Sequence, residues 1–140
     1  MIPKPAASLT DLAVRLATHI APGLQDNFRQ ADAGLLTGLF LTFAQDFERS
    51  VGSQMVDIGE MQAIFAAATA SPMASDCKRL SAAKPQSFYL ADVTACHAEC
   101  SELLIEVHAW AELHDDALNL KIWRYLRAHS ERHKFELPNL

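Results

Sequence analysis

Two pairs of metal-type ligands stand out in the sequence because each pair has a spacing of four residues. Cys96 and Cys100 form one pair, and His129 and His133 form the other. A spacing of four places both side chains of a pair on one face of an α-helix, as two ligands of a single ion require. Two cysteines and two histidines make a tetrahedral zinc set. These four residues are therefore candidate ligands of a zinc-type metal site.

The two pairs must also lie at the same height if they are to meet. A chain reversal near Asp115 and Asp116 puts the cysteines about 17 residues before the turn and the histidines about 15 after it, a mismatch of about 3 Å. His97 lies at this level as a spare ligand. Ordinary packing is the alternative, because free cysteine behaves as a small apolar side chain. We expect no cofactor, with zinc as the alternative.

A second set of polar residues interrupts an apolar helical stripe and suggests a polar pocket. Its members are Asp46, Ser50, Gln54 and Asp57. Buried carboxylates need partners, and acids are rarely fully buried. We therefore expect the set to face solvent, and a polar pocket within a bundle is the alternative. In a third interpretation, Asp46 and Asp57 anchor a small apolar ligand between helices.

Motifs typical of common enzyme classes are absent from the sequence. It contains no glycine-rich phosphate loop, no His-Glu-x-x-His and no nucleophile elbow. The side chains of Cys96 and His97 do not form a catalytic dyad, because adjacent residues of a helix point about 100° apart. We expect a protein without catalytic activity.

Length and charge restrict the remaining classes. The 140 residues fit a single domain, 1–140, and 12 Lys+Arg against 17 Asp+Glu give a net charge of −5, which disfavours nucleic-acid binding. Three cysteines without a Cys-x-x-Cys motif do not make a disulfide framework. The longest apolar run, Gly34 to Ala44, is too short for a membrane span. We expect a cytoplasmic protein that binds neither nucleic acid nor membrane.

The elements that would position these residues are helices. Apolar periodicity and stop signals predict four of them, at residues 8–21, 32–68, 87–114 and 116–134, with a short helix near 75–82 in the long connection. Ser8 to Asp11 resembles a capping box, and Asp115 or Asp116 is the expected cap of the last helix. The predicted fold is all-α: an up-down-like four-helix bundle with a long second helix and a C-terminal antiparallel helical hairpin.

The long second helix has two unlike faces. Its predicted core stripe contains Leu36, Leu39, Phe40, Phe43, Phe47, Ile58, Met61 and Phe65. The opposite face carries small residues, which allow a second backbone to approach closely. This predicted interface consists of Gly34, Gly38, Gly52, Val56, Gly59 and Ala63. Its partner is either the first helix or a second copy of the chain; alternatively, the helix breaks at Gly52 or Gly59.

Charge also distinguishes the last two helices, since residues 92–116 carry acids without Lys or Arg, whereas the last helix is mainly basic. This pattern favours their pairing as a hairpin. Taken together, the sequence predicts a self-associating accessory or interaction module that forms a homodimer. A different protein as its partner is an alternative. The alternative is a zinc-type metal-binding bundle using Cys96, Cys100, His129 and His133.

Overall fold

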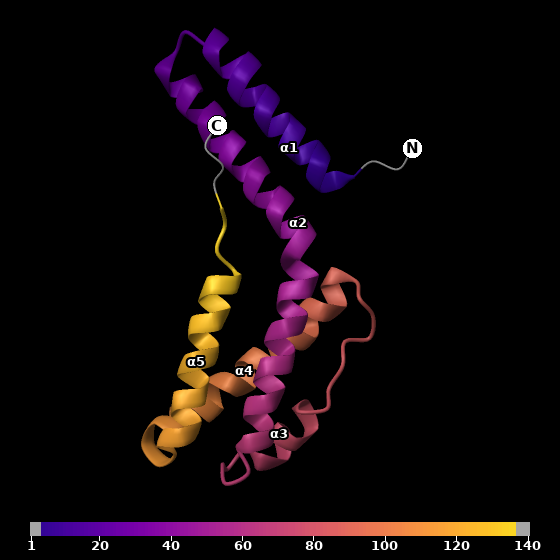
Figure 1. Ribbon diagram of the computed structural model, residues 1–140, viewed down its shortest axis with the longest axis vertical. Coiled ribbons are helices and arrows are strands. Elements are labelled where there is room, and N and C mark those ends of the chain that lie inside the picture. The colour runs from indigo at the N-terminus through magenta and orange to yellow at the C-terminus, as the bar shows by residue number, and fades with distance from the viewer. Residues whose placement is uncertain (1–3, 137–140) are drawn as a thin grey trace. The chain divides into compact units, whose positions relative to one another are not determined.

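The computed structural model describes residues 4–136, and every regular element in this range is helical (Figure 1). The all-α prediction is therefore confirmed. None of the described helices is both long enough and apolar enough to span a membrane. The α-helices are α1 (Pro5–Arg15), α2 (Asn27–Ala67), α3 (Ala74–Leu80), α4 (Leu90–His114) and α5 (Asp116–Arg132).

The chain divides into two compact units. The first comprises the described residues up to Ser50 together with Phe135 and Glu136, and the second comprises Val51–Lys134. Helix α2 contributes to both, so its two halves are described separately below. The expectation of one domain over residues 1–140 remains a prediction.

Helix α1 begins earlier than predicted. It starts at Pro5 with Lys4 as its N-cap and without a side-chain cap, so the expected capping box at Ser8 is wrong. Proline suits this position because its fixed φ is helical and its missing N–H would have no helical partner. After Arg15 the helix widens into a π turn over Leu16–Ile20 and ends in a 3-10 turn over Ala21–Gly23.

The long second helix is continuous over Asn27–Ala67, without a break at Gly52 or Gly59. Asp26 precedes its first residue and accepts a hydrogen bond from the backbone N–H of Phe28 at 2.8 Å. This side-chain cap satisfies one of the free amide donors at the start of a helix. The alternative of two shorter helices is therefore wrong.

In the first unit, α1 runs alongside the first half of α2 (Figure 1). The larger apolar residues predicted to form the core here are instead partly or mostly exposed, because the buried seam of α2 lies on another face. That seam is built mainly from small side chains: Ala6, Ala13, Ala33, Thr37, Leu41 and Ala44. We call the uncovered residues the exposed stripe; each is 40–80% exposed, and they are Phe28, Leu35, Leu36, Leu39, Phe43 and Phe47.

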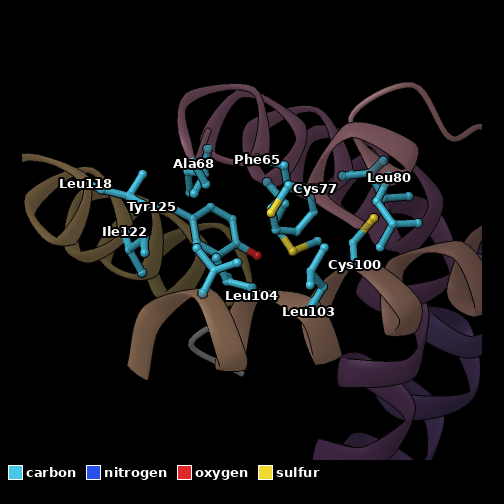
Figure 2. Packing of buried hydrophobic residues seen from close by; sticks show 14 of the residues in the cluster. Phe65, Ala68, Cys77, Leu80, Cys100, Leu103, Leu104, Leu118, Ile122 and Tyr125 are labelled. Atoms are coloured by element: carbon cyan, nitrogen blue, oxygen red, sulfur yellow. The ribbon is translucent and has the colours of Figure 1, made fainter. Parts of the chain in front are cut away.

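The second unit has a core of large side chains contributed by α2, α3, α4 and α5. Phe65 and Ile122 are among its most buried members, and Figure 2 shows them within one cluster that also contains Tyr125 and Leu104. The part of the predicted core stripe that falls here, Ile58, Met61 and Phe65, is buried as expected. This core fixes the faces of α4 and α5 that meet α2.

A single residue separates α4 from α5, and the two helices contact each other. That residue, Asp115, caps α5 as predicted by accepting a hydrogen bond from the Leu118 N–H at 2.9 Å. The basic residues of α5 were expected to pair with the acidic residues of α4, and the structure differs from this expectation. Among the described residues, the ion pairs that α5 makes with another helix run to α2, through Arg132 and the histidines beside it.

Candidate functional site

The carboxylate of Asp57, on α2 in the second unit, is fully buried. One of its oxygens, Oδ2, lies 3.0 Å from His129 Nδ1 and 2.7 Å from His133 Nε2. Its other oxygen, Oδ1, accepts a hydrogen bond from the guanidinium of Arg132. These partners offset the cost of burying the charge. The last turn of α5 and the C-cap that follows it supply all three, because residues 129, 132 and 133 share one helix face.

Arg132 bridges two carboxylates of α2. One guanidinium nitrogen contacts Asp57 and another donates to Glu60 Oε1 at 2.8 Å, while the arginine side chain is only 18% exposed. Asp57 and Glu60 are three residues apart, so both face α5. The planar donor set of arginine holds Oδ1 in place and leaves Oδ2 to the imidazoles.

A third imidazole reaches Asp57 from α4. His97 Nε2 lies 3.3 Å from Asp57 Oδ2, and this buried nitrogen has no hydrogen-bond partner. The ring of His97 stacks on that of His129, with the centroids 6.2 Å apart. Three imidazole nitrogens therefore surround one carboxylate oxygen.

The hydroxyl of Ser101 favours one of the two tautomers of His97. Its hydroxyl donates to the backbone carbonyl of His97 at 2.9 Å and lies 3.4 Å from the ring Nδ1. A hydroxyl has one proton, so an oxygen that donates to the carbonyl is left to accept from Nδ1–H. In this tautomer, the lone pair of Nε2 points toward Asp57.

Burial and charge act on these groups in opposite ways. Burial raises the pKa of Asp57, but the hydrogen bond from His133 and the neighbouring His129 and Arg132 outweigh it, and the pKa of Asp57 lies below its ordinary value. Burial is the main cause that lowers the pKa of His97, although Asp57 opposes it. An ionised carboxylate therefore faces a neutral imidazole at neutral pH.

The arrangement has the donor types of a transition-metal site. Ligand atoms of Asp57, His129 and His133 all lie within 4.8 Å of one another, and no other group of three such residues occurs in the described part of the chain. Imidazole and carboxylate donors suit divalent ions such as zinc, copper, nickel and iron.

We call Asp57 and its partners His97, His129, Arg132 and His133 the cluster. Only half of the predicted zinc set belongs to it. His129 and His133 take part, whereas Cys96 and Cys100 are not among the grouped ligands. Burial raises the pKa of the Cys96 thiol and, most strongly, that of the Cys100 thiol, to about 12, which favours protonated thiols. All three cysteines of the chain are free. The predicted level of α4 relative to α5 is close to the observed one, since His97 stacks on His129. However, the face of α4 that meets Asp57 carries His97 rather than the two cysteines.

The four polar-pocket candidates lie in different environments. Asp57 is buried in the cluster, contrary to the expectation of solvent exposure, and Ser50 is also buried. Gln54 is half-buried and accepts a hydrogen bond from the Thr94 hydroxyl at 3.0 Å. Asp46 is exposed. The four residues therefore do not form one common site.

The predicted small-residue interface is open in the described chain. No neighbouring atom lies within 4 Å of where a Cβ would stand on Gly34, Gly38, Gly52 or Gly59. The remaining members, Val56 and Ala63, are exposed. Within the first unit, helix α1 therefore does not cover Gly34 and Gly38, and the use of this face by a second copy remains a prediction.

A groove beside the cluster bears on the small-ligand interpretation. It has a volume of about 440 Å³, and neither Asp46 nor Asp57 lines it, so the proposed polar anchors are elsewhere. Glu60 is its acidic residue and Tyr125 its aromatic one. Its lining comprises Glu60, Ala63, Ile64, Lys121, Arg124, Tyr125 and Ala128.

Sequence reasoning did not assign Arg132 and Glu60 to the site. The available signal was the helical spacing of Arg132 from His129, which puts a cation on the same face as the candidate ligands. A buried cation on this face of α5 needs a carboxylate on the helix that packs against it. No family model, curated protein or solved structure matches this chain.

Proposed function

We propose that the chain is a small self-associating accessory protein without catalytic activity, and that two copies pair through the exposed stripe of α2. The observation that carries this proposal is the burial pattern of the first unit. Its seam buries mostly small side chains, whereas six large apolar residues along one side of α2 stay 40–80% exposed. A contiguous apolar patch of this kind is typical of an interaction surface.

The energetics favour a covering partner. Burying an alanine contributes far less than burying leucine or phenylalanine, since the hydrophobic contribution scales with apolar area at about 25 cal/mol per Å². A helical pair with a seam of this kind is marginal alone. Covering the exposed stripe supplies the missing burial.

A second copy is the occupant that fits best. Large apolar side chains of about 150–200 Å² each, exposed to this extent, leave about 600 Å² per copy for burial. Pairing two copies buries about 1,200 Å², which reaches the range of specific interfaces. Leu39 lies near the middle of the stripe, so antiparallel pairing about this residue matches each end of the stripe with the other. This is the self-complementarity that a twofold dimer requires.

This pairing also provides a four-helix arrangement, with α1 and the first half of α2 from each copy. The four-helix bundle expected within one chain remains a prediction. The small-residue face of α2 is a second candidate surface for self-association. The acidic net charge of −5 supports a protein partner over nucleic acid. Cytoplasmic location is part of the same proposal.

Native mass spectrometry and sedimentation of the full chain test the proposal. We expect a wild-type dimer that becomes monomeric when Leu39→Glu and Phe43→Glu are combined. The matched control is Leu113→Glu, because Leu113 is 80% exposed on α4 in the second unit and should leave the dimer intact.

A third variant separates the two candidate surfaces. Gly34→Leu adds bulk to the small-residue face, and the dimer should tolerate it if the exposed stripe forms the contact. Loss of the dimer in Gly34→Leu alone would move the contact to the small-residue face. A wild-type chain that stays monomeric at high concentration would contradict self-association itself.

A further inference from the structure

One buried imidazole nitrogen beside Asp57 Oδ2 has no hydrogen-bond partner. His129 and His133 can each donate an N–H to this oxygen, at 3.0 and 2.7 Å. His97 Nε2 lies 3.3 Å from the same oxygen, is buried and has no hydrogen-bond partner. Since Ser101 favours the proton on Nδ1, a bare nitrogen lone pair faces a carboxylate oxygen. Two lone pairs repel unless a positive centre lies between them.

The geometry points to a binding site for one divalent transition-metal ion of the zinc class, held by Asp57 Oδ2, His129 Nδ1 and His133 Nε2, with His97 Nε2 as the fourth ligand. A tetrahedral zinc ion with bonds of about 2.0–2.1 Å sets its ligand atoms about 3.3 Å apart. The three nitrogens already lie 2.7–3.3 Å from Oδ2. Ligand atoms of Asp57, His129 and His133 already lie within 4.8 Å of one another, whereas His97 lies outside that group, so its imidazole must move closer to complete the site.

The donor set selects the class of ion. Three imidazoles and one carboxylate suit zinc, cobalt, nickel or copper, whereas magnesium and calcium prefer oxygen ligands. Coordination needs unprotonated nitrogens, so His129 and His133 must move the proton that faces Asp57 to the other ring nitrogen or release it to solvent. No oxidant or further reactant is involved.

Arg132 and Ser101 act as positioning residues. Arg132 binds Asp57 Oδ1 and so leaves Oδ2 available for the ion, while Glu60 neutralises the added positive charge of the guanidinium. Ser101 orients His97 through Nδ1. Hydrogen bonds from outer residues to the ligands are a regular feature of metal sites, and losing one costs about 10–100-fold in affinity.

Calorimetric titration of the chelator-treated full chain with Zn²⁺ tests the site. We expect one ion per chain, and more than about 100-fold weaker binding when His129→Gln and His133→Gln are combined, because two direct ligands are lost. His108→Gln is the matched control: His108 lies on α4, pairs with Asn119 and Glu112 and is outside the cluster. It should bind Zn²⁺ like the wild type. Thermal melting without metal checks that each variant folds.

Cobalt absorption gives a second measurement that does not depend on affinity. We expect the d–d bands of a tetrahedral nitrogen–oxygen site, unchanged when Cys96→Ser and Cys100→Ser are combined. Strong thiolate charge-transfer bands, or loss of binding in the cysteine variant, would overturn the assignment in favour of the cysteines. No saturable Zn²⁺ binding by the folded wild type would overturn the metal site itself and leave the cluster as a structural charge network.

Discussion

The two units of this chain share one helix, yet they bury different kinds of side chain. The first half of α2 buries mainly small side chains and exposes Phe28, Phe43 and Phe47, whereas the second half buries large residues such as Phe65. The difference does not lie in the helix, which is continuous. It lies in the neighbours: in the second unit α3, α4 and α5 contribute to the core around α2. An apolar stripe becomes core only where other helices cover it.

Acidic residues on α2 show the same difference. Asp46 in the first unit is exposed, whereas Asp57 in the second is fully buried among His97, His129 and Arg132. Both interrupt the same apolar stripe in the sequence. The neighbouring helices therefore decide whether an interruption is a solvated charge or a polar site.

The largest expected effect compares two phenylalanines of α2. Phe65→Ala should lower the free energy of unfolding of the second unit by about 3–5 kcal/mol, because Phe65 is 2% exposed and its loss leaves a cavity. Phe43→Ala should cost this unit less than about 0.5 kcal/mol. Urea unfolding followed by tryptophan fluorescence measures this, since Trp110 and Trp123 both lie in the second unit. Equal costs would contradict the division into unlike units.

A second comparison concerns the two aspartates. Asp57→Asn should destabilise the second unit by about 3 kcal/mol, because it removes one charge from a buried network and leaves Arg132 without its innermost partner. Asp46→Asn should stay within about 0.5 kcal/mol of wild type. Urea unfolding of the metal-free protein gives both values. Asp57→Asn with wild-type stability would show that the network does not stabilise the fold.

Acidification should destabilise the second unit selectively. The pKa of His97 is lowered in the folded chain by burial, so the unfolded chain takes up its proton first as the pH falls below about 6.5. Asp57, His129 and His133 are the titratable groups that face it. The lowered pKa of Asp57 adds a further loss below about pH 4. Urea unfolding between neutral and acid pH measures the slope, and His97→Gln should flatten its upper part; an unchanged profile would contradict this origin.

The smallest expected effect tests the open small-residue face. Gly59→Ala should raise the free energy of unfolding by about 0.5–1 kcal/mol, because alanine suits a helix interior better and no atom lies within 4 Å of the added Cβ. Association should not change. A weaker dimer in this variant would indicate that a second copy covers this face.

Helix positions were largely predictable from the sequence. Periodicity and stop signals indicated four main helices, the long α2 and the cap at Asp115, because these are local properties of the chain. The start of α1 at Pro5 was missed, since the polar residues near Ser8 resembled a capping box. The burial of side chains was predictable only in the second half of α2, where α3, α4 and α5 pack against it. Helical periodicity shows that a face is apolar but not which helix meets it.

The candidate site was half predictable. Spacing identified His129 and His133, and the height of α4 against α5 gave the right level. Neither property shows the rotation of α4, which brings His97 rather than Cys96 toward Asp57. That rotation depends on core packing around Cys100 and Leu104. The spacing of residues within one helix cannot show which side chains of two different helices meet.

Hydrogen exchange of the wild-type chain at low and high protein concentration tests the difference between the units most directly. If the first unit depends on pairing of the exposed stripe, amides of residues 27–50 become more protected as concentration rises, while those of the second-unit core stay equally protected. Protection of residues 27–50 that is already high and independent of concentration would contradict the account.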